Sequence, residues 1–133
     1  MTISSVVSRT SALVLGAGGL ALLFASDTIL PALAQGIPAS AAWLGQLVAA
    51  AWLGAALVNW NARDSVLGGI YGRPVVTLNT VLYVVSALAL WKAPVQPVAL
   101  RALAAPLTLL AAVYAALLLR GPFDGPPSKA HSA

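Results

Sequence analysis

The sequence predicts an all-α protein, an integral membrane bundle of four transmembrane helices. Hydrophobic residues make up 60% of the 133 residues and charged residues 8%, whereas water-soluble domains usually carry about 25% charged residues. The mean hydropathy is +0.92. Four apolar runs, each close to the roughly 20 residues that cross a bilayer, account for most of the chain. We therefore expect one membrane domain at 1–120 and a disordered cytoplasmic tail at 121–133.

The first predicted helix covers approximately residues 10–27 and contains three glycines. The same stretch permits another interpretation, because Arg9 precedes an apolar centre and Ala32-Leu33-Ala34 resembles the cleavage site of a secretory signal peptide. Asp27 and Pro31 lie between the apolar centre and that site, which favours a spanning helix. Whether this run is processed is left open by the sequence.

The other three predicted helices are more regular. Residues 39–60 form a run of 22 residues without a charge, which matches the length needed to span the hydrocarbon core. Residues 74–91 begin on Pro74, a residue suited to the first turn of a helix because its missing N–H would have no partner there. Residues 98–119 contain Pro106 near the middle, which predicts a bend.

The distribution of basic residues predicts the orientation of these helices. Loops rich in Lys and Arg tend to remain in the cytoplasm. One side of the predicted bundle holds five basic residues, Arg9, Arg63, Arg73, Arg120 and Lys129, and the other side holds two, Lys92 and Arg101. Both termini are therefore expected in the cytoplasm. On the opposite side we expect an ion pair between Asp27 and Arg101.

Several classes of function are disfavoured by what the sequence lacks. The chain has no cysteine and one histidine, His131, which lies in the tail, so neither a thiolate metal site nor a haem between helices is expected. Its carboxylates, Asp27, Asp64 and Asp124, lie in loops or at helix ends, which argues against proton-coupled export. The scattered basic residues are explained by membrane orientation, so no nucleic-acid partner is expected. We expect no metal, no cofactor and no catalytic residue.

Small residues at helical spacing predict a packing seam on the second helix. Ala41, Gly45, Ala49 and Ala56 fall on one face, together with Trp52. Membrane helices approach closely through such faces. The seam predicts either packing within the bundle or a contact between two copies of the chain, and the sequence does not decide between them.

Polar residues at membrane depth are costly unless they find a partner or line a wet cavity. Asn79, Tyr83 and Ser86 form one polar stripe on the third helix. Asn59 and Asn79 lie at similar depth from the cytoplasmic ends of their helices, which predicts an amide pair between the second and third helices. In a functional interpretation, the stripe lines a polar path through the membrane.

The loop that joins the second and third helices provides further candidates. It contains glycines, Tyr71, Arg63 and Arg73, but lacks the Lys and Ser/Thr of a phosphate-binding loop. We interpret it as an interfacial turn anchored by Tyr71, with anionic lipid headgroups as an alternative function for its arginines. The candidate ligand or headgroup site comprises Asn59, Arg63, Arg73, Asn79 and Tyr83.

The segment Leu53-Gly54-Ala55-Ala56-Leu57-Val58-Asn59-Trp60-Asn61-Ala62-Arg63, followed by a glycine-bearing loop and an apolar helix, resembles the middle of small bacterial DoxX-like four-helix membrane proteins. The resemblance covers about half of the chain. It implies a four-helix bundle in the bacterial cytoplasmic membrane and carries over no functional residue.

Together these observations predict a non-enzymatic inner-membrane protein that binds a lipid or serves as an accessory subunit of a membrane partner. A homo-oligomer or a larger membrane-protein partner fits this role. The alternative is a small oligomeric channel or transporter whose path is lined by Asn79, Tyr83 and Ser86. A lipid-modifying enzyme is a third interpretation, which is weakened because no acid and base are paired.

Overall fold

The computed structural model describes residues 2–34, 36–67, 69–95 and 97–121. These residues form α1 (Ile3–Leu33), the short 3-10 helix η1 (Ala39–Ala41), α2 (Ala42–Asn61), α3 (Arg73–Trp91) and α4 (Val98–Arg120). Each α-helix, with η1 counted as the start of α2, is long and apolar enough to cross a membrane. The predicted all-α class with four membrane helices is therefore confirmed.

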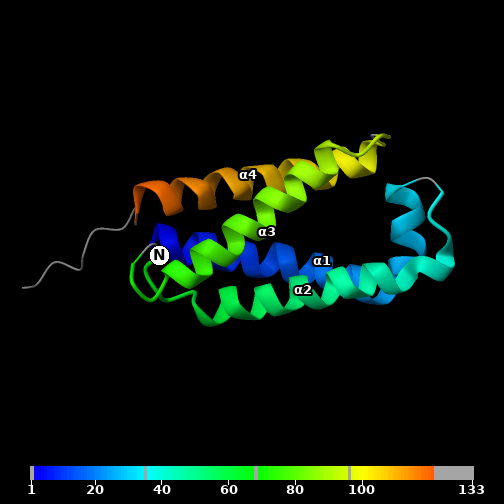
Figure 1. The fold of residues 1–133 in the computed structure, drawn as a ribbon. Coiled ribbons are helices and arrows are strands. Elements are labelled where there is room, and N and C mark those ends of the chain that lie inside the picture. Colours follow the sequence, from blue (N-terminus) through cyan, green and yellow to red (C-terminus); the bar gives the residue numbers. More distant parts are fainter. Residues whose placement is uncertain (1, 35, 68, 96, 122–133) are drawn as a thin grey trace, which may run out of the picture.

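The helices are arranged as two pairs (Figure 1). The backbones of α1 and α2 run close together, as do those of α3 and α4, whereas the backbones of the two pairs approach each other at few points. The N-terminus, the loop between α2 and α3 and the end of α4 lie at one end of the bundle, which we call the terminal end (Figure 1). The connections from α1 to α2 and from α3 to α4 lie at the opposite end, the far end.

The predicted seam of small residues lies between α1 and α2 of a single chain. Gly45, Ala49 and Ala56 are buried on α2. On α1, a Cβ atom added at Gly18 would lie 2.5 Å from the ring of Trp52, so only glycine permits this approach. Packing within the bundle thus accounts for the seam.

α1 is longer than the sequence predicts, since it begins at Ile3 rather than near residue 10 and ends at Leu33 rather than near residue 27. Its start is stabilised by Thr2, whose Oγ1 accepts a hydrogen bond from the amide of Ser5 at 3.2 Å. Ser4, Ser5 and Ser8 lower the hydropathy of the first turns, so the sequence did not predict these turns as part of the helix. The side chains of these serines are buried in the bundle.

A sharp break divides α1. Ala25 has φ −131° and ψ 27°, outside the helical range, and the hydroxyl of Ser26 donates to the carbonyl of Leu22. Such back-bonding by serine bends helices. The 22 residues before the break span about 33 Å, which matches a hydrocarbon core of about 30 Å. The turns after it stand across the space between the two helix pairs at the far end (Figure 1).

The remaining boundaries agree with the predicted ones to within three residues, since α2 begins at Ala42 after η1, α3 begins at Arg73 and α4 ends at Arg120. α4 continues through Pro106 as one helix. The predicted tail at 121–133 lies outside the described residues except for Gly121.

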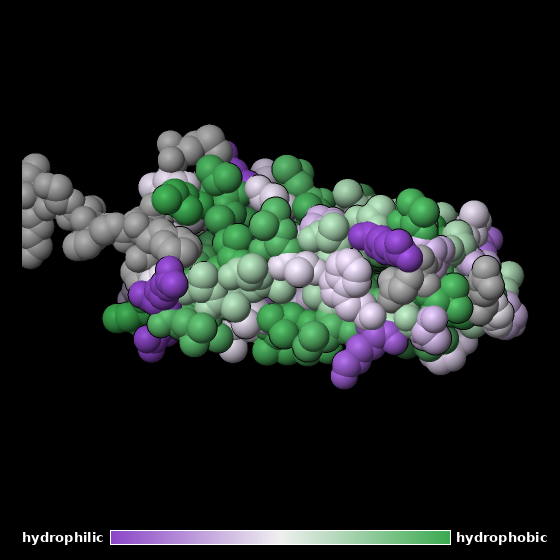
Figure 2. All heavy atoms as spheres, turned by 90° about the horizontal axis from the view of Figure 1, so that it is seen from above, coloured by the Kyte–Doolittle hydropathy of each residue, from purple (hydrophilic) through white to green (hydrophobic). Residues whose placement is uncertain are grey.

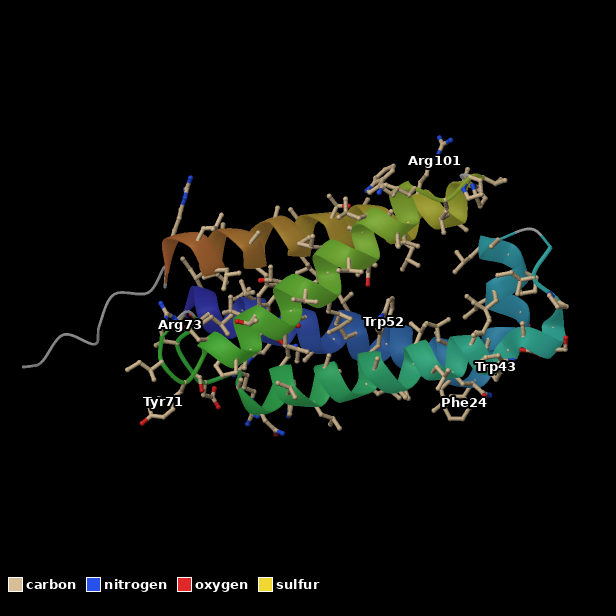
Figure 3. All side chains as sticks on the ribbon, viewed as in Figure 1. Phe24, Trp43, Trp52, Tyr71, Arg73 and Arg101 are labelled. Atoms are coloured by element: carbon tan, nitrogen blue, oxygen red, sulfur yellow. The ribbon has the colours of Figure 1, made fainter. Side chains whose placement is uncertain are left out.

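The expected ion pair between Asp27 and Arg101 is wrong: in the described part of the chain, Asp64 is the carboxylate that pairs, with Arg9 and Arg63. Asp27 and Arg101 are both exposed, and Arg101 points outward from α4, away from α1 (Figure 3). The break at Ala25 turns the segment that carries Asp27 out of line with the rest of α1.

The exterior of the bundle is apolar along its length. Large hydrophobic side chains are exposed on every helix, among them Leu13, Leu57, Val85 and Leu109. The face seen in Figure 2 carries its hydrophilic residues in groups toward the two ends, with hydrophobic surface between them. Such a surface requires lipid as its solvent. Fold and surface together define a multi-pass membrane protein.

Candidate functional site

The centre of the terminal half is a pair of asparagines. Asn59 on α2 and Asn79 on α3 are both fully buried. The Nδ2 of Asn59 donates to the Oδ1 of Asn79 at 2.9 Å, and the Nδ2 of Asn79 donates back at 2.8 Å. The second proton of each amide goes to a carbonyl of its own helix, that of Ala55 or Val75. The amide pair predicted from sequence is confirmed, and all four amide protons are used.

Tyr114 of α4 extends this network to all four helices. Its hydroxyl oxygen lies 3.0 Å from the Oδ1 of Asn59 and 3.0 Å from the Oγ of Ser11 on α1. A phenol has one proton, so Tyr114 donates to the amide oxygen while accepting a hydrogen bond from Ser11. The four residues Ser11, Asn59, Asn79 and Tyr114 form what we call the polar cluster. Each of its hydrogen bonds between side chains joins one helix pair to the other.

Tyr83 packs beside the polar cluster without joining it. Its ring stacks on that of Tyr114 with centroids 5.6 Å apart and an angle of 29° between the planes. Within the described part of the chain, the hydroxyl of Tyr83 and that of Ser8 are buried and have no hydrogen-bond partner. A buried hydroxyl without a partner costs free energy, so these two hydroxyls are expected to lower stability.

The two arginines predicted for the same site lie outside it. Arg63 donates a hydrogen bond to the carbonyl of Trp60 at 2.8 Å and stands over the indole ring of that residue, 4.9 Å from the centroid. Its Nε lies 3.6 Å from the carboxylate of Asp64. Arg73 is exposed at the start of α3 (Figure 3). The five candidates therefore form a buried polar group and a separate basic surface at the terminal end.

A cavity that sequence reasoning missed lies between the two helix pairs, toward the far end. It has a volume of about 410 Å³, within the roughly 300–1,000 Å³ typical of small-molecule sites. Every helix lines it. Its floor is made of buried side chains, Leu22, Trp52 and Leu107. Trp52 occupies the inner side of α2, facing this space (Figure 3).

The rim of the cavity is open to the surroundings of the bundle. Ala21, Val48 and Ala89 line it and are exposed on the surface of α1, α2 and α3. The turns of α1 after the break at Ala25 contribute Ile29 and Leu30 to the lining. The broken end of α1 thus helps to form the space, which explains why apolar periodicity alone gave no sign of it.

Ser86 is the polar side chain among the residues that line this cavity. It is half-buried, and its hydroxyl makes no hydrogen bond to the described residues. Thr80 of α3 and Thr108 of α4 behave differently, because each donates to a carbonyl one turn back in its own helix. Ser86 therefore places one hydroxyl-bearing side chain in the lining of an otherwise apolar space.

The lining of the cavity is almost entirely apolar. The lining of the cavity contains no titratable side chain. Among the described residues, no three His, Cys, Asp or Glu side chains gather as metal ligands. A cavity with so apolar a lining suits a ligand that is mostly hydrocarbon.

Comparison with family models, with curated proteins and with solved structures finds no match to this chain. The resemblance to DoxX-like proteins therefore stays a prediction.

Proposed function

We propose that this protein is a small non-enzymatic protein of the bacterial inner membrane that binds a membrane lipid in the cavity between its helix pairs. Both termini face the cytoplasm in this proposal, because the terminal end carries Arg9, Arg63, Arg73 and Arg120 while Lys92 and Arg101 lie toward the far end. The protein acts alone, as a homo-oligomer, or as an accessory subunit that presents the lipid to a larger partner.

The cavity is the observation that supports this proposal. It is apolar, it is bordered by exposed residues of the spanning helices, and it lies at a depth where hydrocarbon surrounds the bundle. Lipid chains are the molecules most abundant at that depth, so they are the ligands that reach the rim first. A bound chain makes van der Waals contacts with Trp52 and Leu107, and these contacts are absent when the cavity is empty.

The proposal is tested by the lipid that remains bound after purification. The protein is reconstituted with phosphatidylglycerol and phosphatidylethanolamine, extracted in a mild detergent and analysed by native mass spectrometry. Ala89→Phe places a ring at the rim of the cavity and is expected to reduce the retained lipid at least severalfold. Ala105→Phe is the matched control, because Ala105 is exposed on α4 and does not line the cavity.

Retention of lipid by the unaltered chain and by Ala105→Phe, with loss in Ala89→Phe, supports the proposal. An unaltered chain that emerges free of lipid, or equal retention in the two variants, contradicts it.

The alternative of a channel or transporter has less support. Asn79 and Tyr83 are fully buried, and the amide of Asn79 is saturated with hydrogen bonds. Ser86 faces an apolar cavity rather than a polar path. Asn79→Leu separates the two functions, because a transport role predicts altered flux with unchanged assembly, whereas the network seen here predicts a loss of stability.

A further inference from the structure

We infer that the ligand is a phospholipid with an ester-linked chain, drawn from the leaflet at the far end, and that its acyl carbonyl accepts a hydrogen bond from the hydroxyl of Ser86. This inference rests on the proposed function and adds the chemical class and the orientation of the lipid. One chain occupies the cavity, and the headgroup stays at the membrane surface of the far end.

The depth of the cavity identifies the leaflet. Trp52, on its floor, lies ten residues after the start of α2 at Ala42, which places it about 15 Å from that end of the helix. That is about half of a hydrocarbon core of about 30 Å. The cavity therefore reaches from the far-end surface to the middle of the membrane, the region that one leaflet fills with its chains.

Ser86 lies one to two helical turns below the far-end boundary of the membrane. It precedes Trp91, the last residue of α3, by five residues, so it is about 7–8 Å below the end of the helix. Trp91 and Lys92 mark the interface there, since tryptophan and basic residues concentrate at the headgroup level. The carbonyl groups of a phospholipid connect its headgroup to its chains and lie near this boundary.

The free hydroxyl of Ser86 requires a partner that is an acceptor. In hydrocarbon a serine loses free energy unless it makes a hydrogen bond, and Ser86 makes none with the described residues. An ester carbonyl at the rim satisfies it while the attached chain fills the space above Leu22 and Trp52. A ligand with further polar groups would leave them unpaired against this lining.

The experiment compares two lipids that differ only in the carbonyl. Diacyl and dialkyl-ether phosphatidylglycerol of equal chain length are mixed in equal amounts and bound to the full chain, and the ratio retained is read by native mass spectrometry. We expect the ester lipid to be preferred roughly two- to tenfold, the effect of one hydrogen bond. Ser86→Ala is expected to bring the ratio to about one, and Ser86→Thr, which keeps a hydroxyl, to preserve the preference.

The outcomes distinguish lipid binding in the cavity from the role of Ser86 in that binding. Retention of both lipids without preference by the unaltered chain, or a preference that persists in Ser86→Ala, overturns the role of Ser86 and leaves lipid binding intact. Retention of neither lipid overturns the proposed function and this inference with it. Because Ser86 is half-buried and makes no hydrogen bond to the described residues, its substitution is expected to leave the bundle assembled.

Discussion

Asn59 and Asn79 exchange two hydrogen bonds, of 2.9 and 2.8 Å, across the boundary between the helix pairs. With Tyr114 and Ser11, they hold the pairs together in the terminal half. In the far half the pairs enclose the cavity instead. The fold therefore has one end closed by polar contacts and one end able to accept a hydrocarbon chain.

The first prediction concerns this amide pair. Asn79→Leu removes both hydrogen bonds and leaves one N–H of the buried Asn59 amide without a partner, while the bonds of Asn59 to Ala55 and Tyr114 remain, so the free energy of unfolding is expected to fall by about 1–3 kcal/mol. Unfolding in mixed detergent micelles measures it. The double variant Asn59→Leu/Asn79→Leu is expected to cost less than the sum of the two single changes, because no amide is stranded. If the cost of the double variant equals the sum of the two single costs, the two amides have no interaction energy, which would contradict the prediction.

The two tyrosines of the core are predicted to respond differently to loss of the hydroxyl. Tyr114→Phe removes hydrogen bonds to Asn59 and Ser11 and is expected to lower the free energy of unfolding by about 1–2 kcal/mol. Tyr83→Phe removes a buried hydroxyl without a partner, so stability is expected to stay the same or to rise. Thermal unfolding of the two variants in one detergent gives the comparison. A larger loss in Tyr83→Phe would mean that its hydroxyl is satisfied.

Gly45 is predicted to tolerate no side chain. A Cβ atom there would lie 2.5 Å from the Oγ of Ser26, at the break in α1. Gly45→Ala is expected to lower the free energy of unfolding by about 1–3 kcal/mol, the usual cost of overpacking. Gly54→Ala on the same helix is the matched control, because its Cβ would have nothing within 4 Å. Equal stabilities of the two variants would contradict the close packing of α1 on α2.

The orientation is tested by single cysteines, since the chain has none of its own. Ala39→Cys lies at the far end and Tyr71→Cys at the terminal end, and both positions are exposed. With the termini in the cytoplasm, a reagent that cannot cross the membrane is expected to label the first in intact cells and the second only after lysis. Labelling of both in intact cells would contradict a four-span topology.

Much of the fold could be predicted from the sequence, because the need to satisfy the backbone in hydrocarbon leaves few alternatives to spanning helices. The depth of Asn59 and of Asn79 followed from counting residues, and so did their pairing. The partners of Asn59 in Tyr114 and Ser11 could not be predicted, since these residues are 55 and 48 positions away in sequence and neither lies in a recognisable pattern.

The cavity was beyond prediction for a different reason. It depends on the break in α1 at Ala25, six residues before the proline that would have signalled a bend. Pro106 lies within α4, which continues through it as one helix. Ser4, Ser5 and Ser8 of α1 are buried in the interior, yet their polarity made that part of the sequence resemble the region before a helix.

The most direct test of lipid binding is the fluorescence of Trp52. In a variant whose other tryptophans, Trp43, Trp60 and Trp91, are replaced by Phe, Trp52 is 7% exposed and faces the cavity. Phospholipids brominated on the acyl chain are expected to quench it, and Ala89→Phe is expected to abolish the quenching while a variant that retains only the exposed Trp43 remains quenched. Trp52 emission that is unaffected by brominated chains in vesicles where Trp43 is quenched would contradict the presence of a lipid chain in the cavity.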